Sequence, residues 1–191
     1  MLLLIDVIND LEFQGGEKLL RPALRMARKL SVLVKRAHKA NVPVVYVNDN
    51  FGRWRSDFTA QVRHCLDDGV RGQPIAELLK PSEEDYFVLK PKHSAFFSTA
   101  LETLLQTLET DTLILTGLAG DNCVLFTAHD AYMREYRLAV PSDCIASESS
   151  TSNAWALHHM RRFLKVDTRI SSQVDFGVLK RQRRLGGMDV G

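Results

Sequence analysis

Three side chains that could take part in chemistry stand at the ends of apolar runs far apart in the sequence. Asp6 ends the apolar opening of the chain, Lys90 ends a second run, and Cys123 stands directly before a helical pattern. A thiol, a carboxylate and an ammonium together supply a nucleophile, a proton acceptor and a positive charge that can stabilise developing negative charge. We therefore take these three residues as a candidate catalytic set.

Cys123 is the candidate nucleophile because of its place at the start of a helix. The positive end of the helix dipole and the unpaired amides there stabilise a thiolate, so the position predicts a lowered pKa for Cys123. Asp121 or Asn122 supplies a residue of the N-cap type. Each residue also has a purely structural interpretation: Cys123 as a buried apolar side chain, Asp6 as a turn residue, and Lys90 as a lysine that extends to solvent.

The scaffold that must bring these residues together is indicated by the alternation of two patterns. Short runs rich in Val, Ile and Leu alternate with helical patterns, which is typical of a parallel sheet with helices on both faces. The predicted fold class is α/β, a three-layer α/β/α, Rossmann-like fold with a six-stranded, mostly parallel sheet. We expect strands at residues 2–7, 42–47, 86–89, 112–118, 138–140 and 166–170. We expect helices around residues 20–37, 75–79, 98–108, 123–136 and 153–164.

Ligand sites of such sheets lie outside the carboxyl ends of the strands, where all three candidate residues stand. The longest stretch without a regular pattern, residues 51–72, follows the second strand, and long loops at this edge often bind substrate. Phe51 and Trp54 are predicted to give apolar pocket surface. Arg53 or Arg55 is predicted to bind an anionic or polar substrate group, with an exposed loop arginine as the equal alternative.

Composition excludes several classes of protein. The chain has 191 residues, 45% of them hydrophobic, which favours one domain over residues 1–191. Because 25 Lys and Arg stand against 23 Asp and Glu, no nucleic-acid partner is indicated. The one dense basic run begins at about residue 180 and is predicted to be a flexible tail.

The cysteines and the apolar runs bear on the cellular environment. Three cysteines without a CxxC pair argue against a disulfide framework and a structural zinc site, and they fit a cytoplasmic protein. The apolar opening lacks the features of a signal peptide, and no run approaches the roughly 20 residues of a membrane span.

Three blocks of sequence, in order, resemble the motifs of the isochorismatase-like cysteine hydrolase family. They are Leu4-Ile5-Asp6-Val7-Ile8-Asn9-Asp10, Val88-Leu89-Lys90-Pro91-Lys92-His93-Ser94-Ala95-Phe96 and Leu115-Thr116-Gly117-Leu118-Ala119-Gly120-Asp121-Asn122-Cys123-Val124. The resemblance implies that Asp6 takes the proton of Cys123 and that Lys90 stabilises the thiolate. The sulfur then attacks a substrate carbonyl to give a thioester, which water hydrolyses.

The same resemblance implies the geometry of the backbone beside the nucleophile. It implies a cis peptide bond between Leu118 and Ala119 and an oxyanion hole formed by the backbone amides of Ala119 and Cys123. Departures from the family pattern occur at Ile8, Leu11 and Gly120, where the family commonly has Gln, Phe and Thr. These departures leave Asp6, Lys90 and Cys123 unchanged. They affect which features of the family's substrate pocket apply to this chain.

A metal centre is not expected. The nicotinamidase branch of the family holds a metal with an Asp-x-His sequence after the second strand, whereas here Asp49 is followed by Asn50 and Phe51. The next histidine along the chain, His64, stands fifteen residues after Asp49. Since no ligand cluster is evident, we expect neither a metal nor another cofactor.

The resulting prediction is a hydrolase that cleaves a C–N bond of a small molecule, namely an amide, an imide or an N-carbamoyl group, with a homo-oligomer implied by the resemblance. Two alternatives stay open: a vinyl ether hydrolase of the isochorismatase type, which characteristically lacks the cysteine, and a catalytically silent relative that binds a small ligand. A phosphoacceptor receiver domain is disfavoured because Asp6 has no acidic neighbour and about 100 residues follow Pro91.

Overall fold

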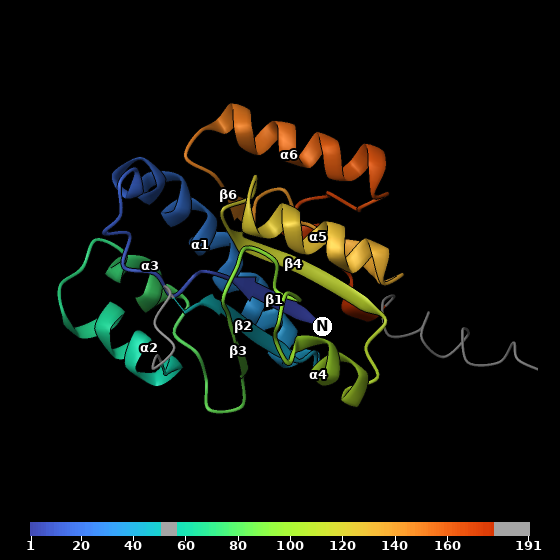
Figure 1. Cartoon of the computed structure of the whole chain (residues 1–191), viewed down its shortest axis with the longest axis horizontal. Helices are drawn as coiled ribbons and strands as arrows, with labels where there is room; N and C mark the ends of the chain where they lie inside the picture. The colour runs from blue at the N-terminus through green and yellow to red at the C-terminus, as the bar shows by residue number, and fades with distance from the viewer. Residues whose placement is uncertain (51–56, 178–191) are drawn as a thin grey trace, which may run out of the picture.

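A parallel β-sheet runs through the middle of the protein (Figure 1). The computed structural model describes residues 1–50 and 57–177. Strands follow the order β3-β2-β1-β4-β5, with β6 paired to the far end of β4, and every pairing between them is parallel. The strands are β1 (Leu2–Ile5), β2 (Val44–Asp49), β3 (Tyr86–Lys90), β4 (Thr112–Leu118), β5 (Arg137–Ala139) and β6 (Ile145–Ala146).

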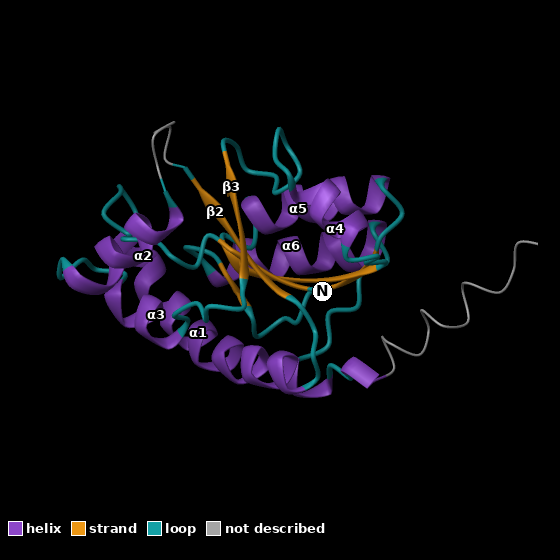
Figure 2. Cartoon of the chain, turned by 90° about the horizontal axis from the view of Figure 1, so that it is seen from below, coloured by secondary structure: helices purple, strands orange, loops and turns teal. Residues whose placement is uncertain are grey.

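Helices cover both faces of this sheet (Figure 2). Helices α1, α2 and α3 lie on one face and α4, α5 and α6 on the other. Alternate residues of β1 enter two separate cores, because Leu2 and Leu4 pack in the cluster that includes α1, while Leu3 and Ile5 pack in the cluster that includes α5. The helices are α1 (Gly16–Lys39), α2 (Phe58–Asp67), α3 (Gln73–Leu78), α4 (Leu101–Thr107), α5 (Cys123–Met133) and α6 (Ser150–Phe163).

The central strands β1 and β4 explain why this sequence forms this sheet. Every residue of both strands is buried, as expected for strands with neighbours on both sides and helices on both faces. Ile5 lies opposite Gly117 in the pairing of β1 with β4. The chain order reverses between these two strands, and their carboxyl ends therefore open at the switch point where α/β sheets bind ligands.

The fold class predicted from the sequence is confirmed, but the sixth strand was placed wrongly. Residues 166–170 form only an isolated bridge between Asp167 and Ala139. The side chain of Asp167 pairs instead with Arg169 at 2.6 Å, and Arg169 is exposed. The sixth strand is the two-residue β6.

The interpretation of residues 51–72 as irregular was also wrong in part, because it contains α2. Asp57 caps this helix by accepting a hydrogen bond from the backbone N–H of Ala60 at 2.8 Å. Phe58 and Cys65 are its buried residues. The apolar face of α2 is narrow, which gives a weak helical pattern.

Some predictions fall on parts of the chain that the structure leaves out. The pocket residues Phe51, Arg53, Trp54 and Arg55 and the basic tail from about residue 180 lie outside the described residues. Within the described residues, no helix combines the length and the apolar character needed to cross a bilayer.

Gly117 is the position at which the sheet tolerates no side chain. Its φ is +110°, and an added Cβ would lie 2.1 Å from the carbonyl oxygen of Ile5. We predict that Gly117→Ala lowers the free energy of unfolding by roughly 3 kcal/mol, through backbone strain and a clash with β1. Urea denaturation measures this loss.

Gly69 provides a matched control, because its φ is +69° and an added Cβ would meet no atom within 4 Å. Gly69→Ala should cost only the left-handed backbone strain, about 1 kcal/mol. Equal losses in the two variants would contradict the importance of the contact between β1 and β4.

Candidate active site

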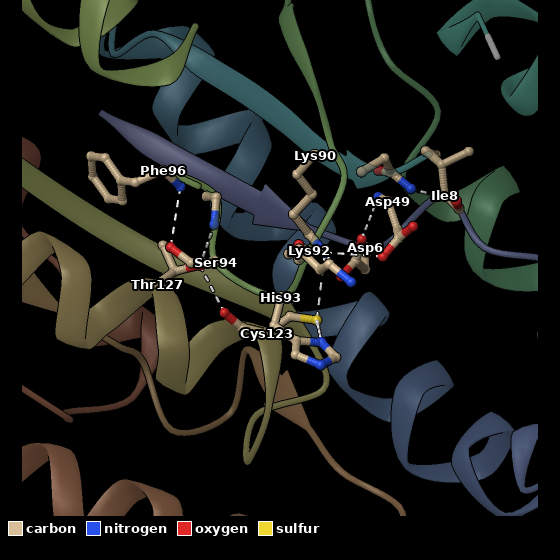
Figure 3. A network of polar contacts seen from close by, with 12 residues as sticks. Asp6, Ile8, Asp49, Lys90, Lys92, His93, Ser94, Phe96, Cys123 and Thr127 are labelled. Carbon is tan, nitrogen blue, oxygen red and sulfur yellow. Dashed lines mark hydrogen bonds and ion pairs between the residues drawn. The ribbon is translucent and has the colours of Figure 1, made fainter. Parts of the chain in front are cut away.

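The three candidate residues converge at the carboxyl edge of the sheet (Figure 3). Asp6 directly follows β1, Lys90 is the last residue of β3, and Cys123 is the first residue of α5, which follows β4. Asp6 has a φ of +52°, a left-handed conformation that aspartate tolerates better than most residues. The sheet thus brings together side chains that are far apart in the sequence.

Lys90 is fully buried and is surrounded by acceptors. Its Nζ lies 2.8 Å from Oδ2 of Asp6, 3.5 Å from Sγ of Cys123 and 3.2 Å from the carbonyl oxygen of Lys92. Oδ2 of Asp49 lies 3.6 Å from the same nitrogen. Burial by itself lowers the pKa of Lys90, but the negative charges around it outweigh burial and raise that pKa. The surrounding negative charges therefore favour the ammonium form of Lys90.

Asp6 is the carboxylate that both other residues contact. Its Oδ1 accepts a hydrogen bond from the backbone N–H of Asp49 at 2.7 Å, and its side chain is hydrogen-bonded to Lys90 and to Cys123. Burial raises the pKa of Asp6, and the charge of Lys90 limits the rise. A carboxylate in this state is paired with a cation and is a stronger base than an exposed aspartate.

The structure corrects the expectation of a low pKa for Cys123. Burial and then the charge of Asp6 raise the pKa of this thiol to about 12, although Lys90 acts in the opposite direction. The helix start was a correct local observation, but the sequence could not show that the sulfur is desolvated and faces a carboxylate. Near neutral pH the group is a thiol that donates a hydrogen bond to Asp6.

The loop that follows Lys90 is hydrogen-bonded to α5, the helix that begins with Cys123. Ser94 donates a short hydrogen bond to Asp130, and the backbone N–H of Ala95 donates to Oγ1 of Thr127 at 3.0 Å. Thr127 in turn donates to the carbonyl oxygen of Cys123 at 2.7 Å. These contacts fix the positions of the ammonium and the sulfur relative to each other.

The backbone before Cys123 forms a tight turn. The peptide bond between Leu118 and Ala119 is cis, the geometry that the family resemblance implies. The N–H of Gly120 donates to the carbonyl oxygen of Ala146 at 2.8 Å. The amides of Ala119 and Cys123, the predicted oxyanion hole, donate to no acceptor within residues 1–50 and 57–177.

The donor set that the structure describes does not suit a metal. Asp49, the acidic residue after the second strand, lies beside the Lys90 ammonium. In the described part of the chain, no three His, Cys, Asp or Glu side chains are grouped as a metal site requires. Metal independence stays a prediction.

One residue near the sulfur was missed by the sequence analysis. Nδ1 of His93 lies 3.8 Å from Sγ of Cys123, and the ring packs against Phe126 with a centroid distance of 5.4 Å. Its only sequence signal is its place three residues after Lys90 in the lysine motif. Contacts of this kind depend on how the loop folds back over α5.

The fold and the site together define an α/β protein with a buried thiol, carboxylate and ammonium at the switch point of its sheet. The chain belongs to the isochorismatase-like hydrolase family, since the Isochorismatase domain model matches residues 1–171. It is 41% identical over 173 residues to YaaI, an uncharacterized isochorismatase family protein of Bacillus subtilis, covering 91% of this chain and 94% of that one.

Two further relatives have different descriptions, one as an amidase and the other as an inactive protein. A solved N-carbamoylsarcosine amidase from Thermoplasma acidophilum superimposes with a TM-score of 0.71 at 26% identity, covering 91% of this chain and 97% of that one. A protein of Arabidopsis thaliana described as a "probable inactive nicotinamidase" is 28% identical over 156 residues, 76% of this chain and 80% of that one.

The raised thiol pKa leads to a prediction with opposite effects on two measurements. Asp6→Asn removes a negative charge next to the sulfur, so it should lower the pKa of Cys123 and speed alkylation by iodoacetamide near neutral pH. The same variant should lose hydrolytic turnover, because it lacks the base. The thiolate absorbance of each protein, followed against pH with Cys123→Ser as the reference, measures the pKa.

Wild-type protein should show no Cys123 thiolate near neutral pH. A wild-type thiolate at pH 7, or slower alkylation of Asp6→Asn than of wild type, would show that Asp6 does not hold the proton on the sulfur.

Proposed function

We propose that this protein is a cysteine hydrolase that cleaves a C–N bond of a small molecule, in an amide, an imide or an N-carbamoyl group, through a thioester on Cys123. The observation that carries the proposal is that the Cys123 sulfur contacts both a buried carboxylate, Asp6, and a buried ammonium, Lys90. The similarity to an amidase that acts on an N-carbamoyl compound supports the choice of bond.

The first chemical step moves a negative charge across the site. As Sγ of Cys123 attacks the substrate carbonyl carbon, its proton passes to the Asp6 carboxylate, which becomes a neutral acid. The negative charge then resides on the carbonyl oxygen. Because Lys90 lies within 3.5 Å of the sulfur, its ammonium stabilises the charge both before and after this transfer.

The tetrahedral intermediate needs donors directed at its oxygen. In the proposal, the backbone amides of Ala119 and Cys123 are these donors, since no described residue accepts a hydrogen bond from either. Each such donor is worth on the order of 10²- to 10³-fold in turnover in other acyl-transfer enzymes. Collapse of the intermediate expels the amine and leaves an acyl group on sulfur, and water then attacks the thioester to release the acid.

The thiol favours this chemistry over cleavage of a vinyl ether. A thioester forms only from a substrate with a carbonyl group, and amides, imides and N-carbamoyl groups each carry a carbonyl bonded to nitrogen. Vinyl ether hydrolysis does not use a sulfur nucleophile. One relative is described as inactive. The experiment must therefore also distinguish hydrolysis from binding without turnover.

Activity should be lost when the sulfur is removed. We expect wild-type protein to hydrolyse at least one compound in a panel of small amides, ureido acids and N-carbamoyl compounds. Cys123→Ala should lower kcat/KM on the order of 10³-fold or more, as expected for the central member of a catalytic unit. Rapid acid quench and mass spectrometry should show an acyl adduct on Cys123 of the wild type.

Cys144→Ala is the matched control, because Cys144 is also buried with a raised pKa but lies in the core on the other face of the sheet. It should keep the activity, and circular dichroism should show that both variants fold. Near-normal hydrolysis by Cys123→Ala would reject the thioester. A folded wild type that binds panel members without turnover would support the silent alternative.

A further inference from the structure

The turn between β4 and α5 contains the backbone amides that the proposed reaction needs. Residues 119–122, which we call the 119–122 turn, form neither helix nor strand. The amide of Ala119 begins this turn and the amide of Cys123 follows it. Within the described residues, neither amide donates to an acceptor that would fix its direction. Their directions therefore depend on how the residues between them are held.

The 119–122 turn is held by β6 and the residue that follows it. Figure 1 shows β6 beside the end of β4, where Leu118 pairs with Ala146. The pairing continues into the turn, because the N–H of Gly120 donates to the carbonyl oxygen of Ala146 at 2.8 Å. One residue further, the N–H of Asp121 donates to Oγ of Ser147 at 3.1 Å. Ser147 thus supplies an acceptor for the turn at the point where the backbone ladder ends.

Ser147 is itself held by a side chain of α6. It is buried, with 2% of its surface exposed, and its hydroxyl donates to Oδ1 of Asn153 at 3.1 Å. A serine hydroxyl can rotate, and the group to which it donates decides where its lone pairs point. Because the hydroxyl donates to Asn153, a lone pair of the Ser147 oxygen is left to accept from the N–H of Asp121. The three residues form one chain of hydrogen bonds from α6 to the 119–122 turn.

Asn153 also packs directly against the 119–122 turn. A Cβ added at Gly120 would lie 2.5 Å from Oδ1 of Asn153 and 3.2 Å from Oγ of Ser147. The family commonly has Thr at the position of Gly120. In this chain, the side chain of Asn153 therefore fills space that a side chain of the turn itself would otherwise take. The departure from the family pattern at Gly120 is matched by a side chain from α6.

We infer that Ser147 and Asn153 are positioning residues that hold the 119–122 turn so that the two predicted oxyanion donors point at the substrate carbonyl oxygen. This inference rests on the proposed function. In this role neither side chain contacts the reacting atoms, and both act through the backbone of the turn. A shift of the turn by about 1 Å would misdirect both donors, and a misplacement of that size can cost on the order of 10²-fold in rate.

Two variants, Ser147→Ala and Asn153→Leu, remove the hydroxyl and the acceptor that orients it. With an amide that the wild type hydrolyses, each should lower kcat on the order of 10- to 10²-fold and leave KM within about threefold, because the donors stabilise the tetrahedral intermediate more than the bound substrate. Asn153→Asp keeps an oxygen acceptor and should retain most of the activity that Asn153→Leu loses. The aldehyde analogue of the substrate, whose oxygen meets the same donors once Cys123 adds to it, should bind Ser147→Ala more weakly by about the factor that kcat falls.

Ser149→Ala is the matched control. Ser149 stands two residues after Ser147, but its hydroxyl caps α6 by accepting from the N–H of Ser152 at 3.0 Å. Loss of this cap should lower the melting temperature by roughly 2–4 °C and leave kcat unchanged. Thermal denaturation of every variant then separates loss of positioning from loss of stability.

The outcomes separate this inference from the proposed function. Unchanged kcat in Ser147→Ala and Asn153→Leu, a loss confined to KM, or equal losses in Asn153→Leu and Asn153→Asp would overturn the inference and leave the thioester proposal intact. The two Asn153 variants decide the question even if Ser147→Ala fails to fold. Unchanged hydrolysis by Cys123→Ala, or no hydrolysis of any panel compound by wild type, would overturn the proposed function and this inference with it.

Discussion

The ion pair between Asp6 and Lys90 is the interaction on which the rest of the site depends. A lysine with no exposed surface loses its hydration, at a cost of several kcal/mol per buried ion. The carboxylate at 2.8 Å and the carbonyl oxygen of Lys92 at 3.2 Å offset this loss, so neither charge is stable there without the other. The pair also sets the state of Cys123, because the nearby carboxylate keeps the proton on the sulfur until a substrate carbonyl arrives.

In the proposed mechanism, this arrangement keeps the Cys123 thiol unreactive until substrate binds. A thiol with a pKa raised to about 12 is a poor nucleophile, but it is hydrogen-bonded to a base and lies next to a fixed cation. In the proposed attack, the negative charge moves toward Lys90 and the backbone amides of Ala119 and Cys123, and no new charge has to be created in a buried site. The fold supplies this geometry. Strands β1 and β4 pair directly, and Thr127 hydrogen-bonds both to Ala95 in the loop after Lys90 and to Cys123 at the start of α5.

Much of this architecture could be predicted from the sequence, and the omissions have physical causes. Asp6, Lys90 and Cys123 stand out because polar residues at the ends of buried strands must meet at one edge of a parallel sheet. The pKa of Cys123 could not be predicted, because burial and the charge of Asp6 are tertiary effects that exceed the local helix dipole. The strand β6 has only two residues, too few for a pattern. His93 reads as an ordinary loop residue until the loop is seen to pack against Phe126.

The most direct test of the account is a double-mutant cycle on Asp6 and Lys90, measured as the single-turnover rate of thioester formation on Cys123. If the pair and the sulfur act as one unit, Asp6→Asn and Lys90→Met should each slow acylation by orders of magnitude, and the double variant should be little slower than the worse single variant. Losses that multiply in the double variant would show two independent contributions and would contradict a single buried ion pair that controls the nucleophile.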